Sequence, residues 1–118
     1  MELVAFLGED KENWGQISAL LNRMELDRAV IIKNKEVSEF SVNDNCDIIS
    51  VNSNQSLLEL KKEIIDKLKP KISGDFEVAL SIASGTGKEH MALISALLCI
   101  PVGIKLVVFT KNGVEFIS

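Results

Sequence analysis

The sequence is poor in the residues that build metal centres and disulfide frameworks. Its 118 residues include two cysteines, Cys46 and Cys99, which form no C-x-x-C pair, and one histidine, His90. One histidine cannot form a usual zinc site by itself, so we predict no metal site. We interpret both cysteines as reduced thiols of a cytoplasmic protein.

Long hydrophobic runs are also missing. The longest apolar stretch, residues 91–104, is interrupted by Ser95, Pro101 and Gly103 and is too short to span a bilayer. The apolar start at residues 3–7 is short and is followed at once by acidic residues, unlike a signal peptide. We therefore predict a cytoplasmic protein with no membrane partner.

Basic charge is scarce as well. The chain has 13 Lys and Arg against 17 Asp and Glu, which gives a formal net charge of −4. This balance argues against a broad basic surface, so we predict no nonspecific binding to long nucleic acid. A small phosphorylated ligand needs only local positive charge and is compatible with this composition. The hydrophobic content of 47% is sufficient for the core of one domain.

The sequence does carry a regular alternation of strand-like and helix-like segments. Periodicity and breaking residues predict strands at residues 2–7, 28–33, 47–51, 76–83, 104–110 and 114–117. They predict helices at residues 11–24, 57–68 and 87–99, and none between 34 and 46. Asn112-Gly113 is a strong hairpin signal. The prediction is an α/β fold: a mostly parallel sheet flanked by helices, with one antiparallel strand at its C-terminal edge.

The most informative stretch is VALSIASGTGKEHMALISALL at residues 78–98. An apolar run breaks at Ser84–Lys88 and resumes as a long apolar helix pattern, which is typical of a strand, a glycine-rich turn and a helix N-terminus. Such a turn exposes backbone N–H groups at the positive end of a helix, here beside two small hydroxyls and one ammonium. The pattern predicts a seat for phosphate. The alternative is that the glycines only permit a sharp turn.

The spacing excludes the commonest phosphate-binding motif. A P-loop with its Gly-Lys at residues 87–88 requires glycine in place of Ile82 and Ser or Thr in place of Glu89. The dinucleotide pattern G-x-G-x-x-G matches at Gly85 and Gly87 but meets His90 at the third glycine. The turn therefore belongs to neither class.

Two loops are expected to face one pocket. In open parallel sheets, ligands bind beyond the carboxyl ends of the strands where the strand order reverses, which here points to residues 7–13 and 84–88. The helix at residues 88–99 has almost no polar face, so we expect it to pack against a second subunit. The alternative is a helix buried entirely within one chain.

These features together resemble the CARF domain, the CRISPR-associated Rossmann-like sensor family. The resemblance rests on the strand, S-G-T-G-K turn and apolar helix at residues 78–98, on a first strand that ends in Gly8-Glu9-Asp10, and on the terminal hairpin. It implies a Rossmann-like fold in a single CARF-like domain over residues 1–118. It also implies a pocket across a homodimer that binds a cyclic oligoadenylate of type III CRISPR immunity.

The implied ligand sets the expected site residues. A ring with an even number of nucleotides, cyclic tetra-adenylate first of all, fits the two-fold symmetry of a dimer. We expect Glu9 and Asp10 to accept adenine amino groups or ribose hydroxyls. The ligand-binding residues implied are Gly8, Glu9, Asp10, Ser84, Gly85, Thr86, Gly87 and Lys88.

Because the chain ends at Ser118 without a fused effector, we expect a stand-alone ring nuclease that cuts the messenger. The catalytic residues predicted are Lys88, Ser84 and Thr86, with a ribose 2′-hydroxyl as nucleophile and with no metal or cofactor. His90 lies two residues beyond Lys88 and is expected to point away from it. Two alternatives remain: a receptor or sink that binds without cleaving, and an unrelated α/β interaction domain.

Overall fold

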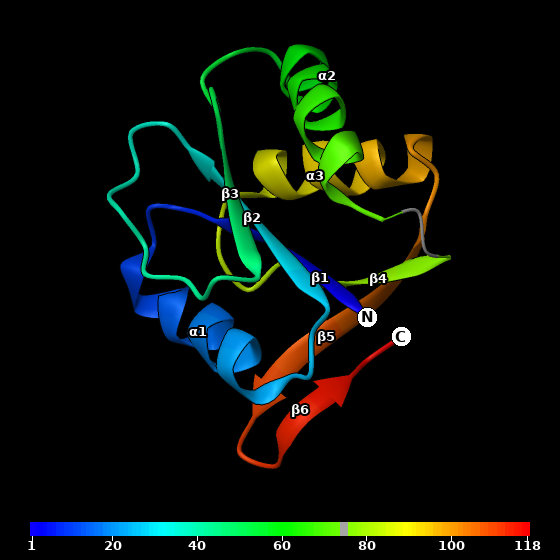
Figure 1. Cartoon of the computed structure of the whole chain (residues 1–118). Coiled ribbons are helices and arrows are strands. Elements are labelled where there is room, and N and C mark those ends of the chain that lie inside the picture. Colours follow the sequence, from blue (N-terminus) through cyan, green and yellow to red (C-terminus); the bar gives the residue numbers. More distant parts are fainter. Residues whose placement is uncertain (74–75) are drawn as a thin grey trace.

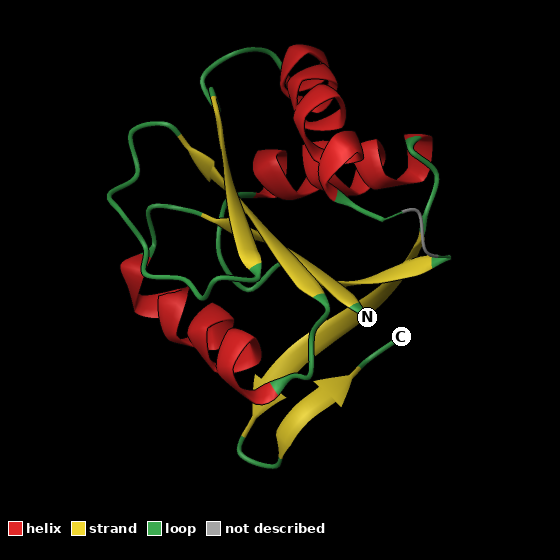
Figure 2. Ribbon diagram, viewed as in Figure 1, coloured by secondary structure: helices red, strands yellow, loops and turns green. Residues whose placement is uncertain are grey.

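Six strands form one sheet with helices on both faces, in a computed structural model that describes residues 1–73 and 76–118 (Figure 1, Figure 2). The strands are β1 (Glu2–Leu7), β2 (Arg28–Asn34), β3 (Cys46–Val51), β4 (Glu77–Ser81), β5 (Gly103–Thr110) and β6 (Gly113–Phe116). The helices are α1 (Trp14–Arg23), α2 (Leu57–Leu68) and α3 (Gly87–Cys99), with short 3-10 turns at Lys11–Asn13 and Lys69–Lys71.

The sheet has the strand order β3-β2-β1-β4-β5-β6. All neighbouring pairs are parallel except β5 and β6, which form the C-terminal hairpin. The predicted α/β architecture is thereby confirmed, and its order is that of a Rossmann-like fold. The strand order reverses between β1 and β4, which lie side by side.

Each face of the sheet has its own apolar core. On the face covered by α2 and α3, buried side chains of β1 such as Val4 and Phe6 pack against Leu60, Ile64 and Leu93. Figure 1 shows α1 on the opposite face. There the intervening β1 residues, Leu3, Ala5 and Leu7, pack against Ile17 and Leu20. The alternation of β1 side chains between the two cores explains why every residue of the strand after Glu2 is apolar.

The segment between β2 and β3 has no helix, as predicted. It lies on the α1 face, where Val37 is buried and Phe40 meets Trp14 edge to face with ring centroids 5.6 Å apart. This aromatic contact and the buried valine cover the face that a crossover helix would otherwise cover.

Several element boundaries differ from the sequence prediction, most of them by one residue. β4 ends at Ser81 instead of at residue 83, because the chain leaves the ladder early to enter the glycine-rich turn. Residues 11–13 form a 3-10 turn, so α1 begins only at Trp14. β3 begins at Cys46 instead of at residue 47, and the Cys46 N–H donates a hydrogen bond to the Asn43 carbonyl in the preceding turn. None of the helices that the structure describes has the length and apolar character needed to cross a bilayer.

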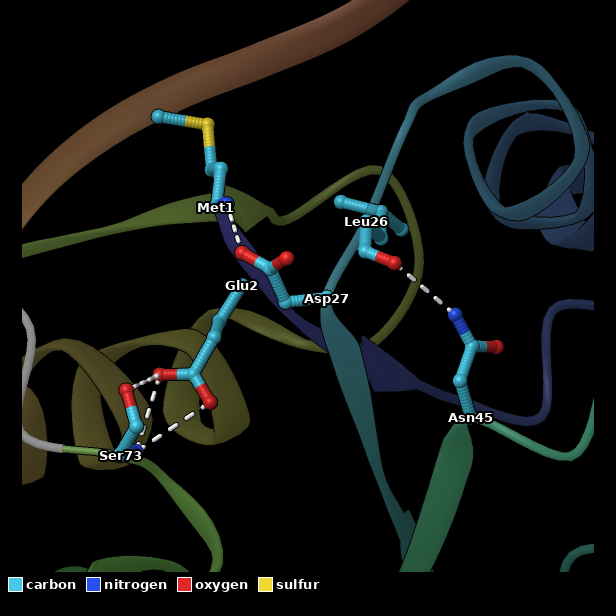
Figure 3. A network of polar contacts seen from close by, with 6 residues as sticks. All are labelled: Met1, Glu2, Leu26, Asp27, Asn45 and Ser73. Atoms are coloured by element: carbon cyan, nitrogen blue, oxygen red, sulfur yellow. Dashed lines mark hydrogen bonds and ion pairs between the residues drawn. The ribbon is translucent and has the colours of Figure 1, made fainter.

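A polar network ties the amino-terminal ends of the strands together (Figure 3). The Glu2 carboxylate, almost fully buried, accepts hydrogen bonds from the hydroxyl and N–H of Ser73 at 3.0 Å each. The terminal ammonium of Met1 pairs with Asp27 at 2.6 Å. These groups pair with one another at the amino-terminal end of the sheet. The opposite end of the sheet, at the carboxyl ends of the strands, contains the candidate pocket.

Candidate functional site

A pocket of about 460 Å³ opens at the carboxyl ends of the parallel strands, where the strand order reverses. The loops after β1, β3 and β4 all contribute to it. Its lining residues are Glu9, Asp10, Asn34, Ser53, Asn54, Gly85, Thr86, Lys88 and Glu89. The pocket thus joins the two loops that the sequence predicted and adds a third wall, from the end of β2 and the loop after β3.

Asp10 fastens the loop after β1 to the glycine-rich turn. Its Oδ1 accepts from the Ser84 hydroxyl at 2.6 Å and from the Gly85 N–H at 3.0 Å. Its Oδ2 accepts from the Asn13 amide at 2.8 Å. The Ser84 oxygen in turn accepts from the Gly8 N–H at 2.8 Å. Both loops are therefore held in one fixed arrangement by a single carboxylate and a single hydroxyl.

This arrangement requires glycine at two positions. A Cβ at Gly8 would lie 2.6 Å from the Cα of Gly85, closer than any real contact of that kind. Gly85 itself has a φ of +106°, which side chains disfavour. The close approach of the two loops thus explains why glycine ends the first strand and opens the turn.

The hydrogen bonds around Asp10 also set its charge. Burial raises the pKa of the Asp10 carboxyl. Hydrogen bonds from the Ser84 hydroxyl, the Asn13 amide and the Gly85 N–H lower it by more, so the pKa lies below its ordinary value of 3.8. Asp10 is ionised at neutral pH and acts as an internal anion at the turn.

Glu89 is a second carboxylate that accepts a backbone N–H of the turn. It forms a capping box with Thr86: the Thr86 N–H donates to Glu89 Oε1 at 2.8 Å, and the Glu89 N–H donates to Thr86 Oγ1 at 3.2 Å. Glu89 Oε2 accepts from the Ser53 hydroxyl at 2.6 Å. Glu89 is consequently buried and satisfied, and it links α3 to the loop after β3.

Two backbone donors of the turn stay open. Asp10 and Glu89 use the amides of Gly85 and Thr86, whereas those of Gly87 and Lys88 make no hydrogen bond with any residue among 1–73 and 76–118. They belong to the first turn of α3, where an intrahelical acceptor does not exist and the helix dipole is positive. Of the two residues, Lys88 lines the pocket, whereas Gly87 lines the groove along α3.

Lys88 is the basic residue that lines the pocket in the described portion of the chain. Its ammonium donates to the carbonyls of Ser53 and Gln55, at 2.9 and 2.5 Å. Both bonds reach the loop after β3, so Lys88 fastens the third wall of the pocket to the start of α3. No pattern in the sequence indicates these two acceptors.

The hydroxyls of Ser84 and Thr86, predicted as catalytic, are both engaged. Ser84 is 0% exposed, and its oxygen lies between Asp10 and the amide of Gly8. Thr86 Oγ1 is the N-cap acceptor of α3. The structure therefore brings Gly8, Glu9, Asp10 and the turn together as predicted, but it gives these two hydroxyls structural contacts.

His90 points away from Lys88, as predicted. Its Nε2 contacts the Ser84 carbonyl at 2.6 Å, and since a carbonyl only accepts, this nitrogen carries the proton. The ring lies on the far side of the turn, at one end of an apolar groove along α3. His90 therefore braces the turn from behind the pocket.

The apolar helix α3 is covered on one side only. Ala92, Leu93, Ala96 and Leu97 are buried within the chain, while Met91 is 59% and Leu98 63% exposed. Between the exposed residues runs a groove of about 450 Å³, which begins at Gly87 beside the turn. The alternative that α3 is buried entirely within one chain is wrong.

Among residues 1–73 and 76–118, no three His, Cys, Asp or Glu side chains gather to hold a metal ion. No family model matches the chain, and no curated protein matches it significantly. The fold and the pocket therefore define the class: a Rossmann-like α/β protein with a pocket at its switch point, bordered by the glycine-rich turn.

Proposed function

We propose that two copies of this chain form a dimer whose facing pockets bind one cyclic oligoadenylate, with cyclic tetra-adenylate as the preferred ring. The observation that carries the proposal is the start of α3 at the switch point: the amides of Gly87 and Lys88 have no hydrogen-bond partner among the described residues, and Lys88 lines the pocket. Membership in the CARF family and a cytoplasmic location belong to this proposal.

The acidic lining of the pocket is compatible with a phosphate at this end. The carboxylates of Asp10 and Glu89 each accept hydrogen bonds from residues of their own chain, which spreads their negative charge. The Lys88 charge and the α3 dipole act within contact distance of a phosphate seated on the open amides. Of the three carboxylates that line the pocket, only that of Glu9 has no internal donor among the described residues, so we place the phosphate at the α3 end, with Lys88.

The apolar groove of α3 supports the dimer. It begins at Gly87, so a second copy that covered Met91 and Leu98 would bring its own turn close to the first. A two-fold axis at this contact creates a symmetric cleft from two pockets. One pocket of about 460 Å³ is in the size range of a site for a single small ligand, so the ring spans both.

The same geometry supports cleavage of the ring. The 2′-oxygen of one ribose attacks the adjacent phosphorus, the bond from phosphorus to the 5′-oxygen breaks, and the proton passes by way of solvent to that leaving oxygen. A 2′,3′-cyclic phosphate and a 5′-hydroxyl result. Lys88 stabilises the charge that grows on the non-bridging oxygens. Ser84 and Thr86 act as positioning residues, because their hydroxyls hold the turn and the helix cap.

A second candidate is a receptor or sink that binds the ring without cutting it. The observation that favours it is the engagement of both turn hydroxyls and of the Lys88 ammonium by groups of the chain itself. In the described pocket, this leaves Lys88 to supply all of the charge stabilisation. Binding would then signal to a separate effector.

The test is incubation with cyclic tetra-adenylate in the presence of EDTA, followed by mass spectrometry. Linear products with a 2′,3′-cyclic phosphate are expected from the ring nuclease. Intact ring together with measurable binding supports the receptor. Metal-dependent cleavage to plain 3′-hydroxyl ends contradicts the mechanism, and absence of binding leaves the unrelated α/β interaction domain.

A further inference from the structure

The groove along α3 is formed by a single face of that helix, which we call the α3 stripe. Its residues recur at spacings of three and four, and they are Gly87, His90, Met91, Ile94, Ser95 and Leu98. No Asp, Glu, Lys or Arg is among them, in a chain with a formal net charge of −4. Two copies of one acidic chain repel each other least across a face without like charges. The α3 stripe therefore suits a second copy of this chain.

The two ends of the α3 stripe differ in size. Gly87 has no side chain, and a Cβ at this position would meet no atom within 4 Å. Leu98 lies eleven residues further along and is 63% exposed. Eleven residues make about three helical turns, so Leu98 and the open space over Gly87 lie on one line along the helix. The stripe thus has a hollow at its start and a projecting side chain at its end.

Two copies of the α3 stripe fill each other when their helices run antiparallel. Centred on the groove, such a pair places Leu98 of each copy over Gly87 of the other, and Met91 beside Ile94. A parallel pair would set Leu98 against Leu98 and leave the space over Gly87 empty. Close packing without voids is the rule in protein interfaces as in cores, so the side-chain sizes favour the antiparallel pair.

The antiparallel arrangement also keeps both pockets on one side of the dimer. Lys88 follows Gly87 and lies about 100° around the helix from it, on one flank of the α3 stripe. The two-fold axis of an antiparallel pair is perpendicular to both helices, so this flank faces the same way in both copies. The two Lys88 residues are then nine residues of helix apart, or about 14 Å along its axis. A parallel pair would place them on opposite flanks, where one ligand could not reach both.

We infer that the α3 stripe binds the α3 stripe of a second copy, antiparallel about a two-fold axis, with Leu98 of each chain seated over Gly87 of the other. The inference rests on the proposed function for the existence of the dimer, and it adds the orientation, the register and the residues in contact. Each site then depends on both chains, because Leu98 of one copy packs on the residue that begins α3 at the turn of the other.

Exchanging the large and small residues tests this register. Gly87→Leu should raise the dimer dissociation constant, measured by sedimentation equilibrium, at least about tenfold, because two leucines cannot share the hollow. Leu98→Ala should also raise it at least about tenfold, because the hollow is then empty. The double variant Gly87→Leu with Leu98→Ala transposes the sizes at both contacts and should return to within about threefold of the wild type. Losses that add in the double variant would overturn the inference.

Each single substitution has a matched control. Gly15→Leu introduces the same side chain near the start of α1, at an exposed position where a Cβ also meets no atom within 4 Å. Leu58→Ala removes the same side chain from α2, where Leu58 is 74% exposed. Both controls should dimerise as the wild type does, and circular dichroism should show equal helical content in all variants. An equal loss of dimer in Gly15→Leu and Gly87→Leu would contradict the contact at Gly87.

Disulfide crosslinking gives a second readout that does not depend on packing energies. In a Cys99→Ser background, Gly87→Cys and Leu98→Cys in one chain are about 16 Å apart along the helix, too far for a bond within that chain. The remaining native thiol, Cys46, is buried. Oxidised glutathione should link two chains when both new cysteines are present and should not link either single-cysteine variant. Efficient crosslinking through Gly87→Cys alone or Leu98→Cys alone would indicate a parallel pair and reject the inference.

These readouts are taken without ligand, so they separate the inference from the proposed function. A dimer rescued by the double variant that binds no cyclic tetra-adenylate in calorimetry keeps the antiparallel contact and rejects the ring as its ligand. A dimer that binds the ring but shows neither rescue nor the crosslink between positions 87 and 98 keeps the proposed function and rejects the contact. A wild-type monomer rejects both.

Discussion

At the scale of single residues, Asp10 decides the shape of the pocket. Its carboxylate accepts hydrogen bonds from the Ser84 hydroxyl, the Gly85 N–H and the Asn13 side-chain amide. It thereby joins two loops, since Asp10 and Ser84 are 74 residues apart in the sequence. Charge-assisted hydrogen bonds of this kind are stronger than neutral ones. The loops therefore depend on the ionised state of Asp10, and their stability depends on pH.

The pH dependence can be measured with Asp10→Asn. The folded-state pKa of Asp10 lies below its ordinary value of 3.8, so its stabilisation is present above that value and is lost as the pH falls through the folded-state pKa. Urea unfolding should show Asp10→Asn less stable than the wild type at neutral pH, with the difference shrinking in acid. Asp44→Asn, at an exposed aspartate, is the control. A stability difference that is constant across this pH range would refute the role of the charge.

Lys88 is the residue on which the proposed phosphate binding depends most. Lys88→Ala removes the ammonium beside the open amides and also two bonds to the loop after β3. We expect binding of cyclic tetra-adenylate to weaken by about 1.5–3 kcal/mol, the usual worth of a hydrogen bond to a charged group. In a ring nuclease, turnover at saturating ligand should slow as well.

Calorimetry and single-turnover assays measure the two effects of Lys88→Ala. Lys111→Ala, at an exposed lysine of the C-terminal turn, is the matched control and should bind as the wild type does. An affinity for the ring that Lys88→Ala leaves unchanged would place the phosphate elsewhere.

At the scale of elements, α2 and α3 begin with the same kind of N-cap, but only α3 begins at the pocket. The hydroxyls of Ser56 and Thr86 each accept the N–H of a glutamate three residues later, at the starts of α2 and α3. Both substitutions to alanine should lower the free energy of unfolding by about 0.5–2 kcal/mol. Only Thr86→Ala should also weaken ring binding, because only α3 starts in the pocket. If Ser56→Ala and Thr86→Ala bound the ring equally well, the Thr86 cap would have no role in ligand binding.

The proposed dimer depends on the outward face of α3. Leu98→Glu places a charge on the groove without disturbing the core, and light scattering should then show a monomer with unchanged helical content. Leu97→Glu is a poor probe of the same question, because Leu97 is fully buried within its own chain and its replacement would unfold the protein. A wild-type monomer at micromolar concentration would rule out the dimer.

At the scale of the whole molecule, the two edges of the sheet differ in how completely their polar groups are paired. At the amino-terminal edge, Glu2 and Ser73 satisfy each other, as do the Met1 ammonium and Asp27 (Figure 3). At the carboxyl edge, the amides of Gly87 and Lys88 and the Nδ2 group of Asn34 have no partner within residues 1–73 and 76–118. These open donors lie at the end of the sheet where we propose that the ligand binds.

The fold and the two loops of the pocket after β1 and β4 could be predicted from the sequence. The reason is that the sequence patterns used are local, whereas the rest of the pocket depends on contacts between distant residues. Breakers and periodicity are local, so the order of elements, the Ser56 cap and the turn at Ser84–Lys88 could be read directly. The third wall depends on which strands become neighbours and where side chains point. Asn34 and the loop acceptors of Lys88 therefore emerged only from the sheet order and the hydrogen bonds.

The early end of β4 has a similar origin. Residues 82 and 83 continue the apolar run and read as strand, yet the approach of Gly85 to Gly8 draws the chain out of the ladder after Ser81. A contact between two distant loops overrode the local pattern. The same close approach explains both the shortened strand and the need for glycine.

The central claim is that two chains together hold one cyclic oligoadenylate, and isothermal calorimetry with cyclic tetra-adenylate tests it most directly. The titration should be done on wild-type protein shown by light scattering to be a dimer, in EDTA and with Lys88→Ala as the comparison. The account predicts saturation at one ring per two chains, with weaker binding in the variant. Saturation at one ring per chain, or no heat of binding at any concentration at which the dimer persists, would contradict it.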